Sequence, residues 1–288
     1  MAQRLVAIHP GLAIRLLPMV TKGDRTPGSL AEAGGKGLFI KELETALQDG
    51  RADIAVHSMK DMPAELPAGL VIGAALERAD PSDGLISLQH ASLASLPRGS
   101  RVGTSSLRRQ SQLRHRRPNL EIVVLRGNVD TRLRKLDAGE FDATVLACAG
   151  LERLGLAIRI RERLTAEQML PAVGQGVIGI ECRDDAEIRA LLRPLEHVPT
   201  RTCLDAERAF SARLGGSCQS PIAGFAELRG DRLHLRGLVG SPDGTKVFAD
   251  AIEGAADIAA SLGTMLAERV LAAGAGALLL ELVAGAGH

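Results

Sequence analysis

The sequence predicts an α/β protein made of two α/β domains and a smaller α+β domain at the carboxyl end. Up to about residue 180, apolar stretches of strand length alternate with amphipathic helical stretches, which is typical of βαβ units and a parallel sheet. Two segments that contain Pro, 77–81 and 170–176, interrupt this alternation. Beyond residue 198 the pattern changes to one helix, three period-two stretches and a long helix.

The composition favours several aliphatic cores. The chain has 288 residues, of which 45% are hydrophobic, so two or three domains are expected. It has five Phe and no Trp or Tyr, and its cores must be built from Leu, Ile, Val and Ala. The net charge of +1 excludes bulk attraction of polyanions, yet segment 98–135 holds eleven Arg or Lys against two acids. That segment is a local positive field on a nearly neutral protein.

No targeting or membrane segment is predicted. Residues 1–11 lack the pattern of a signal peptide, and the apolar stretch 277–284 is too short to span a bilayer. The four cysteines lack the paired spacing of a disulfide framework or a zinc site: Cys148, Cys182, Cys203 and Cys218. We therefore expect a cytoplasmic protein with reduced thiols, no metal and no membrane contact.

The first domain is predicted to combine residues 1–77 with 177–194. Its expected elements are strands at 13–20, 54–56, 70–75 and 177–180 and a helix at 35–47. The run Ile54–Val56 has the composition of a buried parallel strand, and it breaks into a polar segment, 57–61, before Pro63. Open α/β sheets place their chemistry at such strand ends. A strand exit with a solvated Lys60–Asp61 pair explains the pattern equally well.

The second domain, 81–172, is predicted to bind anions. Its expected strands are 102, 120–125 and 143–147, and its expected helices are 106–116, 129–136 and a short one from Leu151. Hydroxyl residues and two Arg at the helix start make an anion site with the helix dipole, namely Thr104, Ser105, Ser106, Arg108 and Arg109. Ordinary capping explains the hydroxyls but not the Arg pair. Arg126, Arg132 and Arg153 follow the other strands, which predicts a cleft for a ligand with many carboxylates.

Nucleic-acid binding by segment 98–135 is disfavoured, because single-strand binders interleave aromatic residues with the charge and this segment has none. Contact with phosphates alone stays a weaker alternative. Some of these cations, at 114–117, have the pattern of a solvated helix end.

The third domain is predicted to span 198–288, with a helix at 202–214, strands at 223–228, 232–239 and 246–252, and a helix from Ala255. Cys148, Cys182 and Cys203 lie in helical or apolar stretches and are expected to be buried. Cys218 lies in a Gly- and Ser-containing loop, 215–221, where an exposed thiol is a candidate for covalent attachment. A bystander cysteine fits these residues equally well.

Taken together, these stretches resemble the porphobilinogen deaminase (hydroxymethylbilane synthase) family. Six motifs in family order carry the resemblance through nearly the whole chain: 34–39 (GGKGLF), 57–61 (HSMKD), 103–110 (GTSSLRRQ), 125–128 (LRGN), 170–176 (LPAVGQG) and Cys218-Gln219 before Pro221.

The resemblance implies a transferase with two domains like periplasmic binding proteins, an active cleft between them and a third, small domain. It implies condensation of four porphobilinogens into a linear tetrapyrrole with loss of ammonia, by a monomer. A covalent dipyrromethane cofactor primes the chain through a thioether to Cys218, and the catalytic aspartate corresponds to Asp61. The residues that hold acetate and propionate groups correspond to Lys36, Lys60, Thr104, Ser105, Ser106, Arg108, Arg109, Arg126, Arg132 and Arg153.

The residues agree with this chemistry. Each pyrrole carries two carboxylates, so an arginine-rich cleft is needed and large aromatics are not. Loss of ammonia leaves a cationic azafulvene, whose charge a carboxylate such as Asp61 would stabilise, and the same group would pass protons.

One departure from the family pattern concerns the beginning of the chain. The family opens with a strand that carries Arg-x-Ser-Pro-Leu-Ala, whereas this sequence begins at Met1-Ala2-Gln3, in an expected helix. We therefore expect the first domain to lack its first strand and two cofactor contacts. The alternative function is a truncated or impaired homologue that only binds a polyanion.

Overall fold

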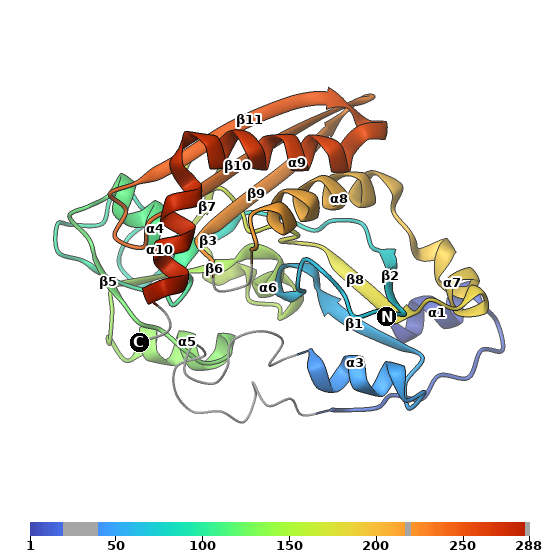
Figure 1. Ribbon diagram of the computed structural model, residues 1–288. Coiled ribbons are helices and arrows are strands. Elements are labelled where there is room, and N and C mark those ends of the chain that lie inside the picture. Colours follow the sequence, from blue (N-terminus) through green and yellow to red (C-terminus); the bar gives the residue numbers. More distant parts are fainter. Residues whose placement is uncertain (20–39, 217–219, 286–288) are drawn as a thin grey trace.

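The computed structural model describes residues 1–19, 40–216 and 220–285, whose strands form three sheets (Figure 1). Two α/β units lie side by side, and a third unit lies across them at the top of Figure 1. The mixed α/β class and the smaller α+β unit at the carboxyl end are as predicted. The exact domain boundaries stay a prediction.

The first sheet contains three strands in the order β1 (Ile54–Ser58), β8 (Ile178–Arg183) and β2 (Leu70–Ala75). β8 pairs antiparallel with both neighbours, which confirms that the chain returns to this sheet after the second unit. The prediction that β1 is a buried parallel strand is wrong, since its pairing is antiparallel and Val56 is 47% exposed. An apolar run indicates a strand but does not reveal the direction of its neighbour.

Within the described residues, this first unit has three helices: α1 (Ala2–Ile8), α3 (Lys41–Gln48) and α7 (Ala186–Leu192). The helix predicted at 35–47 is confirmed from Lys41 onward, and residues 35–39 lie outside the described residues. The strand predicted at 13–20 is wrong for 13–19, which have no regular secondary structure, and Val20 is not described. Apolar side chains of α1, α7, β2 and β8 share one core.

The second sheet has the order β5-β4-β6-β3-β7. Its strands are β3 (Asp83–Ser87), β4 (Arg101–Gly103), β5 (Glu121–Val123), β6 (Ala143–Ala147) and β7 (Glu162–Leu164), and its helices are α4 (Leu107–Arg116), α5 (Val129–Asp137) and α6 (Cys148–Arg153). β4 pairs parallel with β5 and β6 as predicted. β3 and β7, which were not predicted, make the sheet mixed because β3 is antiparallel to both its neighbours.

The third unit is an antiparallel meander covered by helices α8 (Val198–Arg213) and α9 (Ala259–Val270) (Figure 1). Its strands confirm the three predicted period-two stretches: β9 (Ile222–Arg229), β10 (Arg232–Gly240) and β11 (Val247–Ala255). A π-helical turn (Leu271–Ala275) leads to α10 (Gly276–Gly285). Phe210 is fully buried in this core, and a Cβ at Gly237 would meet its ring, so β10 needs glycine at that position.

A buried ion pair joins the three units where the chain crosses between them. Arg78 donates to both carboxylate oxygens of Glu207 on α8, from Nη1 at 2.6 Å and from Nη2 at 3.0 Å. Glu207 is 0% exposed and also accepts from the backbone N–H groups of Gly174 and Ala226. Arg78 further donates from Nε to the carbonyl of Gln175. One carboxylate thus fixes both crossing segments to the third unit.

Candidate active site

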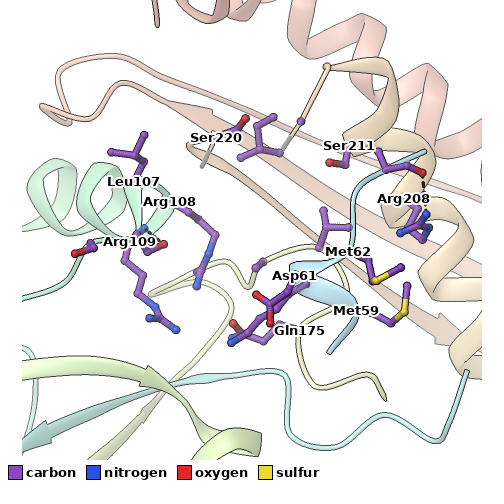
Figure 2. A pocket seen from close by; sticks show the side chains of 18 of the residues that line it. Met59, Asp61, Met62, Leu107, Arg108, Arg109, Gln175, Arg208, Ser211 and Ser220 are labelled. Atoms are coloured by element: carbon purple, nitrogen blue, oxygen red, sulfur yellow. Dashed lines mark hydrogen bonds between the residues drawn. The ribbon is translucent and has the colours of Figure 1, made fainter. Parts of the chain in front are cut away.

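A cavity of about 660 Å³ opens where the three units meet (Figure 2). Its walls come from the segment after β1, the start of α4, the region of α5, the second crossing and the end of α8. Eight of the predicted site residues line it: Lys60, Asp61, Ser105, Ser106, Arg108, Arg109, Arg126 and Arg132. Three separate segments of the chain therefore bring the predicted carboxylate and the predicted cations to one place.

Asp61 and Lys60 lie on a 3₁₀ turn (Met59–Asp61) directly after β1. The turn is anchored by two buried methionines: Met59 is 2% exposed and Met62 is 8% exposed. Glycine is required opposite the turn, because a Cβ at Gly179 would meet the Met59 sulfur. With its apolar residues facing the core, the turn leaves Asp61 exposed in the cavity wall. Figure 2 shows Asp61 between Met62 and Gln175, with Arg108 and Arg109 extending from α4 on the other side.

The hydroxyl groups before α4 serve the backbone. Ser106 is the N-cap and accepts from the N–H of Arg109, and buried Thr104 accepts from the N–H of Ser106. Ser105 donates to the carbonyl of Leu125 at 2.8 Å. Capping therefore accounts for one of the three hydroxyls, that of Ser106, and Thr104 is not among the residues that line the cavity.

Arg108 and Arg109 are nearly buried, at 3% and 6% exposed, and share one carboxylate. Asp83 of β3 accepts from Arg108 Nη1 at 2.7 Å and from Arg109 Nη2 at 2.7 Å. The prediction for this pair was contact with ligand carboxylates, and the structure adds a carboxylate of the protein itself. Nothing in the sequence near 108 reveals Asp83, which lies 25 residues upstream.

Arg126 and Arg132 add positive charge on the same side of the cavity. Burial, followed by the nearby charges of Arg109 and Arg126, lowers the pKa of Arg132, while Asp61 acts in the opposite direction. The cavity lining agrees with the prediction that several strand ends deliver arginines to one place. Arg153 does not line the cavity; its Nη2 donates to the carbonyl of Gly176 at 3.0 Å.

The prediction of a solvated helix end at 114–117 is right for His115 and Arg116, which are exposed, and wrong for Arg114 and Arg117, which are half-buried. Arg114 donates to the carbonyl of Pro242 at 2.7 Å, and His115 lies 3.1 Å from the carbonyl of Gly244. Arg116 donates to the carbonyl of Glu167, and half-buried Arg117 donates to three carbonyls of the segment 93–96. Backbone carbonyls from distant segments bind these groups. The sequence around 114–117 does not indicate these carbonyl partners.

Two predicted residues, Lys36 and Cys218, lie outside the described residues. Gly216 and Ser220, the described residues on either side of 217–219, both line the cavity. The other three cysteines are buried as predicted, and burial raises the pKa of each thiol, that of Cys203 to about 11.

Sequence reasoning missed three residues of the site: Asp83, Gln175 and Arg208. Gln175 lines the cavity from the second crossing and donates to Asp83 at 3.1 Å. Arg208 of α8 lines it from the third unit and donates to the carbonyl of Ala64, three residues after Asp61. Arg208 lies on α8, which ends shortly before Cys218 in the chain. This closeness to Cys218 is the sequence feature that could have indicated Arg208.

Within the described ranges, no helix has both the length and the apolar character needed to cross a membrane. In the same part of the chain, no group of three or more His, Cys, Asp or Glu side chains is placed to hold a metal ion.

The fold and the site define a mixed α/β protein with a cavity, between its three units, that one exposed carboxylate and several cations line. Two family models match the chain. "Porphobilinogen deaminase, dipyromethane cofactor binding domain" matches residues 1–190, and "porphobilinogen deaminase, C-terminal domain" matches residues 201–272. The chain belongs to the porphobilinogen deaminase family. This confirms the predicted family, its transferase class and the predicted dipyrromethane cofactor.

Three of the solved structures with some likeness are periplasmic proteins or lipoproteins. A periplasmic substrate-binding protein of an ABC transporter from Coxiella burnetii is 15% identical, with 67% of this chain and 84% of that chain covered and a TM-score of 0.43. A putative methionine-binding lipoprotein from Bacillus subtilis is 18% identical, with 56% and 76% covered and a TM-score of 0.39. The BvgS periplasmic VFT2 domain from Bordetella pertussis is 16% identical, with 66% and 73% covered and a TM-score of 0.39. At these scores the family match is the finding that bears on function.

Proposed function

We propose that this chain condenses four porphobilinogens into hydroxymethylbilane with release of ammonia, and that it does so in the cavity that Lys60, Asp61 and the arginines line. The observation that carries the proposal is the meeting of one exposed carboxylate, Asp61, with a set of cations contributed by separate elements. A monomer in the cytoplasm is the state that we propose for it.

The residues of the cavity fit a dipyrromethane. Two linked pyrroles carry four carboxylates, and the wall offers Lys60, Arg126, Arg132 and the outer nitrogens of Arg108 and Arg109. Arg108 Nε is buried with no hydrogen-bond partner among the described residues, which is the mark of a site that awaits an acceptor. The volume of about 660 Å³ lies within the usual range for ligand sites. When bound through Cys218, the group supplies the pyrrole carbon to which substrate is joined.

The positively and negatively charged residues of the cavity then have different roles. The cations bind acetate and propionate groups and so orient the substrate, since charge-assisted hydrogen bonds are strong and directional. Asp61 lies where its carboxylate balances the positive charge that develops as ammonia leaves, and it can hold a proton for the departing amine. Two buried methionines beneath the turn keep that carboxylate in place.

Replacing Cys218 by Ser tests the proposal directly. We expect folded protein without the mass of two linked pyrroles and without turnover, because a hydroxyl is a much poorer nucleophile than a thiolate. Intact mass spectrometry of the purified wild-type and variant chains is the measurement. Cys203→Ser, at a buried thiol on α8, is the matched control and should keep the adduct. An adduct on the Cys218 variant, or none on the wild type, would contradict the proposal, and the latter result would favour a protein that only binds polyanions.

The cavity should also lose carboxylate affinity as the pH rises past about 8. Burial and the neighbouring Arg109 lower the pKa of Lys60 to about 8, against the opposing effect of Asp61. Lys60 is therefore charged below this pH and increasingly neutral above it. We expect the KM for porphobilinogen to rise between about pH 7 and about pH 10 in the wild type and to rise less in Lys60→Arg, because arginine stays protonated there.

The same pKa fixes the sign of the effect on stability. The folded state lowers the pKa of Lys60 from 10.5, so its charged form destabilises the fold below about pH 8. That penalty fades as the pH rises from about 8 toward the unfolded pKa of the lysine.

The KM measurement also has an outcome that contradicts the prediction. Parallel KM profiles for the wild type and Lys60→Arg would show that Lys60 does not bind the substrate.

A further inference from the structure

Asp83 lies behind the cavity wall and contacts three residues that line it. Its carboxylate, 0% exposed, accepts from Arg108 Nη1, from Arg109 Nη2 and Nε, and from Gln175 Nε2. Burial opposes ionisation of this carboxyl, but the charges and hydrogen bonds of Arg108 and Arg109 outweigh it and hold the pKa of Asp83 far below its usual range. The group is therefore an anion at every pH at which the protein works.

Asp83 occupies the edge of Arg109 that best binds a carboxylate and one nitrogen of Arg108. The Nε and Nη2 nitrogens of Arg109 form a fork that matches both oxygens of a carboxylate, and both donate to Asp83, at 3.2 Å and 2.7 Å. Nη1 of Arg108 is shared between Asp83 and the carbonyl of Leu170 at 2.8 Å. With respect to the described residues, Arg108 Nη2 and Arg109 Nη1 are left for a ligand.

Asp83 also reduces the net charge of Arg108 and Arg109. Two guanidinium groups and one carboxylate leave a single net positive charge at this part of the wall. An approaching ligand carboxylate meets one outer nitrogen from each arginine and is repelled by the permanent negative charge of Asp83. The ligand therefore binds more weakly than it would to two unpaired arginines.

We propose that Asp83 is a positioning residue that acts as a resident counter-ion, aligning Arg108 and Arg109 while weakening their grip on ligand carboxylates so that these can exchange. The inference rests on the proposed function, in which each added pyrrole brings two more carboxylates into one cavity. Contacts to earlier pyrroles must then be released and formed again. An arginine pair without Asp83 would bind ligand carboxylates more tightly and so slow their release.

The first test compares the wild type with Asp83→Asn, which keeps the shape and removes the charge. Binding of 1,2,3,4-butanetetracarboxylate, measured by isothermal titration calorimetry, should tighten by about tenfold, which corresponds to about 1.4 kcal/mol. For the reaction, KM for porphobilinogen and kcat should both fall, since substrate binds more tightly and carboxylates are released more slowly. A purely structural role for Asp83 would instead weaken probe binding or leave it unchanged, with KM constant or raised.

A second comparison keeps the test decisive if Asp83→Asn does not fold. Arg109→Gln removes one positive charge, and the double variant Asp83→Asn/Arg109→Gln restores the net charge of the wild-type pair. We expect the double variant to bind the tetracarboxylate about tenfold more tightly than Arg109→Gln alone. Glu253→Gln, which removes an exposed carboxylate paired with Arg232 on the third sheet, is the control and should leave binding unchanged.

Unchanged or weaker binding of the probe after loss of the Asp83 charge, in each comparison that yields folded protein, would overturn the inference. Failure of the proposed function has a different signature. It would appear as a wild-type chain without a pyrrole adduct or turnover, whatever the calorimetry shows.

Discussion

Asp61→Asn should lower kcat for hydroxymethylbilane formation by two to three orders of magnitude or more. The amide keeps the shape of the side chain but cannot balance positive charge on the reacting substrate, and electrostatic contributions of this kind are worth roughly 3–4 kcal/mol. Substrate binding should suffer less, because the cations that bind carboxylates are separate residues: Lys60, Arg126 and Arg132. Steady-state kinetics on purified protein, with adduct occupancy checked by mass, gives both quantities.

Glu65→Gln is the matched control for this prediction. Glu65 is an exposed carboxylate four residues further along the same segment and does not line the cavity. Its loss should leave kcat nearly unchanged. If Asp61→Asn turned over within about tenfold of the wild type, which is only about 1.4 kcal/mol, Asp61 could not be the catalytic carboxylate.

Glu207→Ala should reduce the free energy of unfolding by roughly 3–5 kcal/mol, the usual cost of breaking a buried ion pair. The substitution leaves the Arg78 guanidinium without its bidentate partner and removes the acceptor for the N–H groups of Gly174 and Ala226. Because these groups belong to different units, the loss should loosen the junction between them. Urea unfolding followed by circular dichroism measures the change in free energy.

An exposed pair between α8 and α9 provides the comparison for Glu207. Arg213 Nε lies 2.6 Å from Glu268 Oε1, with the two side chains 47% and 54% exposed. Exposed pairs of this kind contribute about 0–1 kcal/mol, so Glu268→Ala should have a small effect. Equal losses for the two variants would mean that the junction does not depend on the buried carboxylate.

Elements whose pattern is local could be predicted from the sequence. β2 and β6 have the predicted bounds, and α4 begins after Ser106 because that serine caps it. β3 was missed because Asp83 at its start suggests a turn, whereas the structure buries that carboxylate against two arginines. β7 was missed because it has three residues, of which Glu162 and Arg163 are charged. Their place in the sheet is decided by neighbours that are distant in the chain.

For the site, too, local features could be predicted and distant partners could not. The motif around Asp61 and the arginines after successive strands could be found, because chemistry at the ends of strands follows from the layout of α/β sheets. What each arginine faces could not be found, since the partners are a carboxylate far upstream for Arg108 and Arg109 and backbone carbonyls for Arg117. A sequence shows the charge of a side chain but not the group that it meets after folding.

The order β1-β8-β2 has a consequence for how the protein folds during synthesis. β8 lies between β1 and β2 and pairs with both, yet roughly a hundred residues separate it from β2 along the chain. The ribosome therefore completes the whole second sheet before it releases the strand that joins the first two. Because domains fold as they emerge and long-range pairings form slowly, the second unit should reach its native state while β1 and β2 still wait for their partner. During that interval the edges of β1 and β2 are open to pairing with other chains, so the nascent protein should depend on chaperones most while residues 76–177 are being made.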